Sequence, residues 1–309
     1  MDTFIQQIIN GLVLGSMYAL VALGYTMVYG VLNLINFAHG DVLMIGAMVG
    51  LSILKLLDVF MPGLPGAVQL AIAIAGAIPV CMLVNIIIER VAYRRLRNAP
   101  RLAPLITAIG VSTLLTTFAM MIWGRNPLPF PQLLSTEPIA IGGAVISQTQ
   151  VLLLALAALS MGGLVLLVEK TKMGRAMRAT AENPRVAGLM GVDSNKVIIA
   201  TFAIGAALAA VAGVMWGANY SSIQFAMGFL PGLKAFSAAV LGGIGNIYGA
   251  MIGGILLGLI EAMGAGYIGD LTGGFLGSHY QDIFAFVVLI IVLTIRPSGI
   301  MGERVADRA

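Results

Sequence analysis

Charged residues are scarce in this chain. Of its 309 residues, 17 are Lys or Arg and 13 are Asp or Glu, so only 10% are charged while 59% are hydrophobic. Soluble domains carry about 25% charged residues, and this composition therefore excludes an ordinary soluble globular protein. The long apolar runs also lack the alternation of apolar and polar residues that the strands of a membrane β-barrel need. The sequence predicts an all-α, polytopic membrane protein in contact with the lipid bilayer.

Cysteine and histidine are almost absent. The single cysteine, Cys81, excludes an intrachain disulfide. The two histidines, His39 and His279, have no neighbouring cysteine, histidine or acidic cluster with the spacing of metal ligands, so no metal site is expected. No Lys or Arg precedes Lys55, so the N-terminus lacks the basic region of a cleavable signal peptide.

Nucleotide-binding and catalytic motifs are also missing. The sequence contains no GxxxxGK[ST] motif and no LSGGQ-type signature, so the chain is not expected to hydrolyse ATP. No serine, histidine or aspartate pattern of an intramembrane protease occurs, and we expect no enzyme activity of its own and no cofactor bound by this chain. The net charge of +4 comes from basic residues that cluster in a few loops, which indicates membrane topology and no nucleic-acid partner.

Apolar segments of about twenty residues, long enough to cross a bilayer as a helix, occur eight times in a single domain spanning 1–309. They lie near 8–29, 41–57, 67–88, 104–123, 150–168, 197–217, 248–264 and 281–296. A further apolar stretch, 219–247, is interrupted by Pro231, Lys234 and several glycines. We expect eight to nine transmembrane helices, with a broken or re-entrant segment near 219–247.

The distribution of basic residues predicts the orientation. The loop 89–101 carries five arginines and the loop 169–196 carries six basic residues, so both are expected to be cytoplasmic. The loop 124–149 holds only Arg125 and is rich in proline, and is expected to face outward. The C-terminal tail carries three arginines and is expected inside. The N-terminus is then outside, and these positions require an odd number of crossings.

Because eight long apolar segments give an even number, the segment 219–247 must supply the ninth crossing. The chain then has two polar interruptions at membrane depth, near 36–41 and within 219–247. Backbone freed by such a break is tolerated only where it is buried in protein or lines a wet cavity. Discontinuous helices in corresponding places of two halves are typical of a transport site near the midplane.

The first interruption lies in the stretch INFAHGDVLMIGA, which holds Asn36, His39 and Asp41. A bare aspartate at the centre of a transmembrane helix costs roughly 2.5–3.5 kcal/mol. One interpretation is that these three side chains face a cavity or an interface on the translocation path. The alternative is that they lie at the cytoplasmic mouth between the first two spans, where Asp41 favours the start of a helix.

The second interruption contains polar candidates of the same kind. They are Asn219, Tyr220, Gln224 and Lys234. A lysine inside a broken crossing needs a partner, cavity water or a route for its ammonium to the interface. It either braces the break or lines the translocation route, and the sequence leaves both open.

Glycine recurs every four residues in VLGGIGNIYGAMIGGILLGLIEAM, at Gly245, Gly249 and Gly253. Small residues at this spacing form a stripe that lets helices approach closely in a membrane. We expect these glycines to serve helix packing.

The loop TAENPRVAGLMGVD predicts a short helix. Asn183 is placed to cap it, Pro184 suits its first turn and Gly191 ends it. Its apolar side comprises Val186, Leu189 and Met190. Such a face normally docks in a groove on a partner protein; the alternative is that it folds back on the bundle or lies on the lipid surface.

Three strings together resemble one known family. They are NGLVLGSMYALVALGYTMVYGVLNLINFAHGDVLMIGA, MGRAMRATAENPRVAGLMGVD, and KAFSAAVLGGIGNIYGAMIGG followed by RPSGIMG. They closely resemble permease subunits of bacterial branched-chain amino acid ABC importers of the Liv H type, over nearly the whole chain. Importers of urea and short amides use similar permeases, so the resemblance is less specific for the substrate.

The resemblance implies a heteromeric importer in the bacterial inner membrane. The partners would be a second, related permease, two cytoplasmic ATPases that use ATP and Mg, and a periplasmic solute-binding protein on which selectivity largely rests. The loop 169–196 matches the family's coupling loop, although it departs from the EAA pattern of sugar-importer permeases. Its candidate coupling residues are Arg178, Glu182, Asn183, Pro184, Val186, Leu189, Met190 and Gly191.

The mechanism expected from this resemblance is alternating access, in which the coupling helix tilts the bundle and a passage opens between two permeases. Two other classes of protein stay open. An ion-coupled secondary transporter would use Asp41, Lys234 and Glu261 and would need no ATPase. A membrane-embedded enzyme is the weaker alternative, because the sequence holds no catalytic set.

Overall fold

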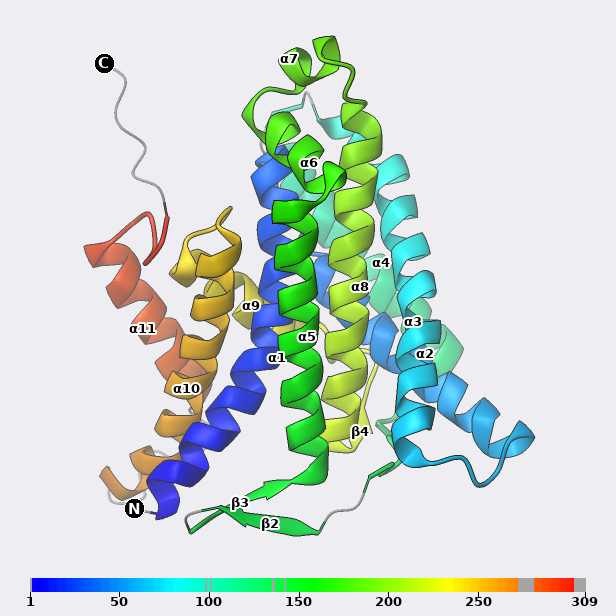
Figure 1. Cartoon of the computed structure of the whole chain (residues 1–309), viewed down its shortest axis with the longest axis vertical. Helices are drawn as coiled ribbons and strands as arrows, with labels where there is room; N and C mark the ends of the chain where they lie inside the picture. The colour runs from blue at the N-terminus through cyan, green and yellow to red at the C-terminus, as the bar shows by residue number, and fades with distance from the viewer. Residues whose placement is uncertain are drawn as a thin grey trace.

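A computed structural model describes residues 2–97, 99–100, 102–134, 137–141, 143–271 and 281–302 of the chain (Figure 1). Seven of the described helices are long and apolar enough to cross a membrane. They are α1 (Asp2–Leu32), α2 (His39–Phe60), α3 (Gly66–Ile88), α4 (Leu102–Trp123), α5 (Gln148–Lys170), α8 (Ser194–Tyr220) and α10 (Ile247–Leu271). Two shorter apolar helices are α9 (Phe229–Gly242) and α11 (Gln281–Ile295). The predicted all-α, polytopic membrane architecture is confirmed, with α9 inside the predicted broken segment.

The bundle has two distinct ends (Figure 1). At one end, strand β2 (Pro138–Ile141) pairs antiparallel with β3 (Ala144–Ser147), and we call this the hairpin end. At the other end lie α6 (Lys172–Glu182) and α7 (Pro184–Leu189), and we call this the α7 end. A further short pair, β1 (Leu128–Pro129) with β4 (Ser222–Ile223), joins two loops.

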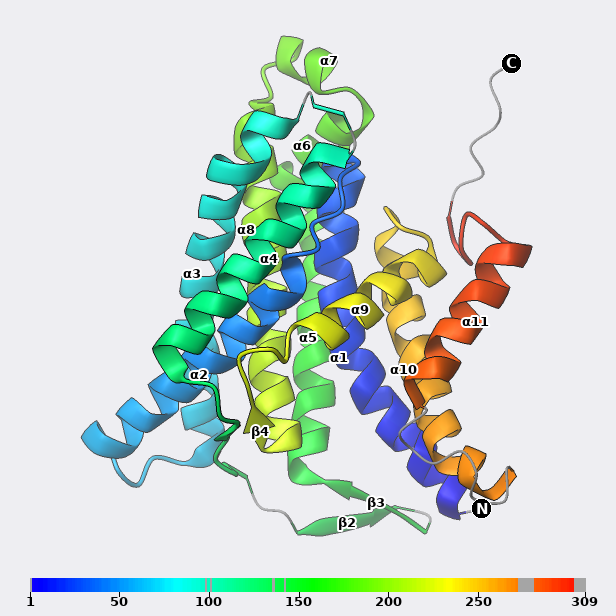
Figure 2. The same ribbon diagram turned by 180° about the vertical axis from the view of Figure 1, so that it is seen from behind.

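The two loops rich in arginine and lysine share the α7 end. The first continues α3 as a short π-helix, η1 (Glu89–Tyr93), and a 3-10 turn, η2 (Arg94–Leu96). Arg97 Nη1 donates to Asn195 Oδ1 at 2.6 Å and so joins this loop to the start of α8. The strands β1–β3 of the loop 124–149 lie at the opposite end (Figure 2). This separation agrees with the predicted grouping of loops.

Both interruptions have the same architecture (Figures 1 and 2). Helix α1 runs from the hairpin end to the α7 end, the chain returns to mid-depth, and α2 starts there and runs to the hairpin end. In the second half, α8 runs to the hairpin end, the chain returns to mid-depth, and α9 starts there and runs to the α7 end. The crossing that parity required within 219–247 is therefore made by a non-helical segment and α9 together.

The helices α1–α2–α3 and α8–α9–α10 form an inverted pair. Helix α1 packs on α9 and α10, while α8 packs on α2 and α3, and the two sets run in opposite directions between the ends. Small residues bring the backbones together: a Cβ atom on Gly15 would lie 2.8 Å from Ile255 Cα, and one on Gly46 would lie 2.7 Å from Ala210 Cα. Close approach of this kind is what packs helices in lipid, and inverted repeats are common in transporters.

The two short helices meet where each begins. A Cβ atom on Gly40 of α2 would lie 2.5 Å from the carbonyl oxygen of Gly228, just before α9. A Cβ atom on Gly232 of α9 would lie 2.7 Å from Gly40 Cα. Only glycine fits at this contact, so the interruptions join at mid-depth through backbone against backbone.

The predicted glycine stripe divides into two kinds of position. Gly249 and Gly253 lie against Gly242 and Ala238 of α9, in the close contact that was expected. Gly245 instead lies in the turn before α10 with φ 97°, and a Cβ atom on it would meet nothing within 4 Å. Its left-handed backbone, and not helix packing, is what favours glycine there.

Candidate functional site

The polar residues of the first interruption are buried within the bundle. Asn36, His39 and Asp41 are 2%, 1% and 3% exposed. The hydroxyl of Tyr93 donates to Asn36 Oδ1 at 2.9 Å, and Thr116 Oγ1 donates to Asp41 Oδ1 at 3.3 Å. Because α2 starts at mid-depth (Figure 2), His39 and Asp41 lie deeper in the bundle than a cytoplasmic mouth, while Asp41 occupies the first turn of α2 as the second interpretation expected. Asn36 precedes α2 and bonds to Tyr93 of η1, toward the α7 end. The role of the three residues on a translocation path stays a prediction.

His39 packs at the first residue of α2. Its ring meets the ring of Tyr25 edge-on, with centroids 5.0 Å apart. It also covers Gly24, where a Cβ atom would lie 2.1 Å from His39 Nε2. The imidazole therefore fills the space that the glycine leaves on α1, and it fixes the start of α2 against that helix.

The lysine of the second interruption is paired. Lys234 on α9 is 6% exposed, and its Nζ lies 2.6 Å from Glu261 Oε1 on α10 and 2.6 Å from Asp282 Oδ1 on α11. The hydroxyl of Tyr18 on α1 donates to Glu261 Oε2 at 3.0 Å. Buried charges need such partners to offset the cost of leaving water. Of the two open roles of Lys234, the structure shows the bracing contact: it ties the broken crossing to α10 and α11.

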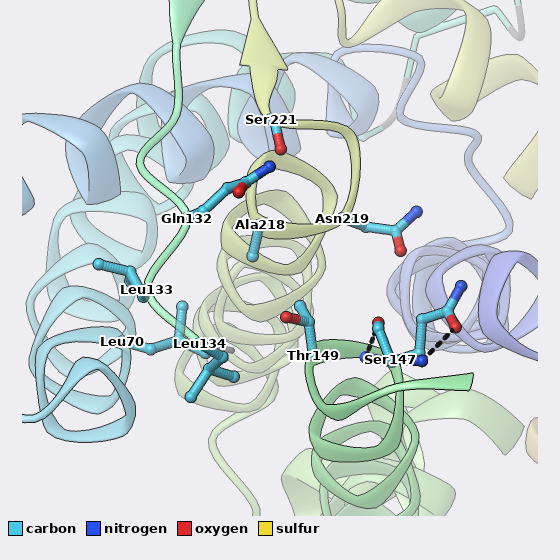
Figure 3. Close-up of a pocket in the computed structure, with 10 residues that line it drawn as sticks. Leu70, Gln132, Leu133, Leu134, Ser147, Thr149, Ala218, Asn219 and Ser221 are labelled. Atoms are coloured by element: carbon cyan, nitrogen blue, oxygen red, sulfur yellow. Dashed lines mark hydrogen bonds between the residues drawn. The ribbon is translucent and has the colours of Figure 1, made fainter. Parts of the chain in front are cut away.

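A pocket of about 130 Å³ lies at the hairpin end, and we call it the hairpin pocket. Its lining includes Leu70, Gln132, Leu133, Ser147, Thr149, Gln150, Asn219 and Ser221. Ser147 begins α5 with a capping box: Gln150 N donates to Ser147 Oγ at 3.2 Å, and Ser147 N donates to Gln150 Oε1 at 3.1 Å. In Figure 3 the carboxamide of Asn219 points away from Leu133 and Leu134.

A second pocket, of about 270 Å³, lies among α1, α5, α8 and α10, and we call it the Glu261 pocket. Its polar lining is Gln7, Asn10, Gln150, Asn219, Tyr220 and Glu261, and its apolar lining is Val13, Leu14, Ala262 and Ala265. Gln150 and Asn219 line both pockets. These two side chains therefore separate the hairpin pocket from a pocket that contains a buried carboxylate.

The predicted path residues separate into three groups. Asn219 and Tyr220 line the Glu261 pocket, and Lys234 lies directly behind it, bound to Glu261. Gln224 is exposed in the turn before α9. The cluster at 36–41 does not line either pocket.

Sequence reasoning missed most of the pocket. Gln7 and Asn10 are polar residues three apart in the first apolar span, a spacing that places both on one helix face. Glu261 and Asp282 are acidic residues in predicted spans, and the need of Lys234 for a counter-ion could have pointed to them. Nothing local marked Gln150, because its place depends on how α5 packs.

Helix α7 has the predicted ends. Asn183 Oδ1 accepts hydrogen bonds from Arg185 N at 3.0 Å and Val186 N at 3.1 Å, and Pro184 occupies the first helical position. Gly191, with φ 85°, follows the helix. These features confirm the short helix and its caps.

The apolar side of α7 is open. Val186, Leu189 and Met190 are 52%, 87% and 80% exposed, whereas Ala187 is buried. The helix projects from the bundle (Figure 1). The alternative in which this face folds back on the bundle is therefore wrong.

The segments beside α7 are firmly attached to the bundle. Arg178 of α6 donates to the carbonyl of Val168 in α5. Glu182 is the last residue of α6. Asp193 caps α8 by accepting from Asn195 N and Lys196 N at 3.1 and 3.2 Å, and these hydrogen bonds hold the pKa of its carboxyl below its usual range. The α7 helix is therefore joined on one side to α6, which bonds to α5, and on the other side to the capped start of α8.

A buried ion pair braces the same end of the bundle. Glu89, fully buried, pairs with Arg97, and Asn85 Nδ2 donates to the carbonyl of Phe202 on α8 at 2.7 Å. These contacts fasten the end of α3 to α8. Within the described ranges, no group of three or more His, Cys, Asp or Glu side chains could hold a metal ion.

Comparison with known proteins places this architecture in a family. The family model of the branched-chain amino acid transport system permease component matches residues 7–293. The chain is 46% identical to the high-affinity branched-chain amino acid transport system permease protein BraD of Pseudomonas aeruginosa, over 97% of this chain and 96% of BraD. It is 44% identical to the corresponding LivH of Escherichia coli, over 97% and 96%. A probable LivH of Methanocaldococcus jannaschii is 32% identical over 95% and 91%.

The match covers both interruptions, the α7 segment and nearly all of the bundle. The relatives are named as transport permease proteins. This chain belongs to the branched-chain amino acid transport system permease family.

Proposed function

We propose that this chain is the membrane-spanning permease subunit of an ABC importer that carries leucine, isoleucine and valine into the bacterial cytoplasm. The names of its relatives support the substrate class. The exposed apolar face of α7, on a chain without nucleotide-binding motifs, is the observation that supports an external ATPase. A permease for urea, short amides or other amino acids is the nearest alternative.

The proposed complex has a second related permease, two cytoplasmic ATPases and a periplasmic solute-binding protein. The α7 end faces the cytoplasm, because it carries the loops 89–101 and 169–196 with their basic residues. The N-terminus then lies outside and the C-terminus inside the inner membrane. The binding protein docks at the hairpin end on the loop 124–149. The segment 265–280 is a second docking candidate, and its residues 272–280 lie outside the described part of the chain.

The mechanism follows from how α7 is attached. Closure of the ATPases on ATP and Mg, which this chain does not bind, displaces α7 and thereby α6 and α8. Helix α8 packs on α1, α2 and α3, and α2 meets α9 at Gly40, so the displacement reaches both interruptions. The bundle tilts as a unit and opens a passage between the two permeases.

A second candidate function is ion-coupled secondary transport through Asp41, Lys234 and Glu261. Lys234 and Glu261 are in contact, but Asp41 bonds to Thr116 on α4 and does not belong to that cluster. The three groups therefore do not form one site. Gradient-driven transport by the purified chain alone would favour this candidate.

The coupling role is tested by placing charge on the apolar face of α7. We expect the double variant Leu189→Asp, Met190→Asp to lose ATP-driven leucine uptake in proteoliposomes that contain all subunits, because two carboxylates cannot dock in an apolar groove. Leu189→Ile, Met190→Leu, which keeps the face apolar, is the matched control and retains uptake. Full uptake by the double variant would contradict the coupling role.

A further inference from the structure

The Glu261 pocket combines three kinds of surface on one small cavity. Glu261 supplies a buried carboxylate, Asn219 and Tyr220 supply a carboxamide and a hydroxyl, and Val13 and Leu14 supply an aliphatic wall. Small-molecule sites typically have apolar walls with a few polar groups that fix orientation. The volume of about 270 Å³ suits a ligand smaller than a drug molecule.

The carboxylate of this pocket has unused acceptor capacity. Glu261 accepts from Lys234 through Oε1 and from Tyr18 through Oε2. A carboxylate offers about four lone-pair sites, so further donors can bind. The formal charges of Lys234, Glu261 and Asp282 sum to −1, because one lysine meets two carboxylates. The base of the pocket therefore favours a cation.

The end of α8 supplies hydrogen-bond donors to the same pocket. Among the described residues, the Asn219 carboxamide and the Tyr220 hydroxyl have no hydrogen-bond partner, although Asn219 is only partly exposed. Tyr220 is held by ring contact with Trp216, at a centroid separation of 4.7 Å. Both groups donate well to a carboxylate. The acceptor thus comes from α10 and the donors from α8, and all three line one cavity.

We propose that the Glu261 pocket is a transit site for the zwitterion of an aliphatic amino acid. The ammonium binds the Glu261 carboxylate, the α-carboxylate accepts from Asn219 and Tyr220, and the aliphatic side chain lies on Val13, Leu14, Ala262 and Ala265. The hairpin pocket, which shares Asn219 and Gln150, is its entrance. This inference rests on the proposed function, and it deepens it by placing a substrate site within this chain.

A cysteine protection experiment tests the site directly. Ala265 lines the pocket one helical turn from Glu261, and the native Cys81 is buried, so Ala265→Cys supplies the reactive thiol. In the assembled complex without binding protein and without ATP, a cationic methanethiosulfonate should label this thiol. We expect millimolar leucine to slow labelling several-fold. Ala179→Cys on α6 is the control, labelled at a rate that leucine does not change.

Leucine analogues separate the two charged contacts. Isoamylamine, which keeps the ammonium, is expected to protect partly, and isocaproate, which lacks it, is expected not to protect. Equal protection by isocaproate would overturn the ammonium contact, because a site of charge −1 has no reason to bind an anion. Absence of protection by leucine would overturn the site.

Two variants test the roles of individual residues that line the Glu261 pocket. On the Ala265→Cys background, Glu261→Gln should raise the leucine concentration for half-protection by about tenfold, the equivalent of one 1.4 kcal/mol interaction. Asn219→Ala, whose side chain has no partner to lose, should raise it by a smaller factor and carries the test if Glu261→Gln fails to assemble. Unchanged protection in Asn219→Ala and in any assembled Glu261→Gln would overturn the proposal.

The outcomes for the site and for the proposed function are distinguishable. The complex that carries Ala265→Cys can take up leucine with ATP while leucine fails to protect the introduced thiol. That result would keep the importer assignment and overturn the transit site. Protection by leucine without uptake in a complete complex would keep an amino acid site and contradict the importer assignment.

Discussion

The two interruptions of the bundle have the same backbone plan and different chemistry. At the start of α2, the buried polar side chains meet neutral groups: Asn36 Oδ1 accepts from Tyr93, and Asp41 Oδ1 accepts from Thr116. At α9, Lys234 joins three helices through two carboxylates and adjoins a pocket. The repeat thus keeps the geometry of a mid-depth break in both halves. In the second half, the three charged side chains both brace α9 and adjoin the Glu261 pocket, whereas the first interruption is held by neutral donors and packing.

Among the variants of the two interruptions, replacement of Lys234 should lower stability most. Lys234→Met leaves Glu261 and Asp282 without their shared cation, and breaking a buried pair costs about 3–5 kcal/mol. We expect a large drop in the thermal stability of the purified complex, measured by size-exclusion chromatography after heating. Lys234→Arg, which keeps the charge, is the control and should lose much less. A wild-type melting profile for Lys234→Met would show that the cluster does not brace α9.

A substitution at the contact between the two interruptions should have the next largest effect on stability and uptake. Gly40→Ala places a methyl group 2.5 Å from the Gly228 carbonyl oxygen, so the starts of α2 and α9 must separate. Overpacking of this kind costs about 1–3 kcal/mol, and uptake should fall with it. Gly162→Ala on α5, where nothing lies within 4 Å, is the matched control and should behave as wild type. Equal stability and uptake of the two variants would contradict the junction.

The smallest effect is expected at Asp41. Asp41→Asn keeps an oxygen that can accept from Thr116, so stability should change by about 1 kcal/mol or less. The same Asp-to-Asn exchange at Asp282 removes one of the carboxylates that face Lys234 and should cost more. Thermal stability of the two variants, measured side by side, sharpens the comparison. A larger loss of thermal stability in Asp41→Asn than in Asp282→Asn would show that the first interruption contributes more to stability than the charged cluster does.

Local signals were sufficient for the elements that depend on local chemistry. The apolar runs predicted each membrane helix, and the parity of basic loops required the crossing that α9 completes. The α7 helix was predictable because Asn183, Pro184 and Gly191 act within one turn of their own positions. Its exposure followed from an apolar face in a loop with basic residues around it.

Contacts between distant segments were beyond the same reasoning. Lys234 was expected to need a partner, and Glu261 and Asp282 stood among the acidic residues of predicted spans, but only the packing of α9, α10 and α11 shows that both contact it. The Glu261 pocket joins Gln7, Gln150 and Asn219, which are brought together only by the packing of α1, α5 and α8. The glycine contact between Gly40 and Gly228 is equally remote in sequence. Gly245 was misjudged for a different reason. Its regular spacing suggested helix packing, but it lies in a turn whose positive φ requires glycine.

The central claim is that this chain is a passive gate driven by external ATPases through α7. The most direct measurement compares leucine uptake into proteoliposomes that hold the permeases alone with uptake into those that also hold the ATPases, each with binding protein and with ATP on the α7 side. The account predicts concentrative uptake only when the ATPases and hydrolysable ATP are present. Accumulation of leucine against a gradient by the permeases alone would contradict it.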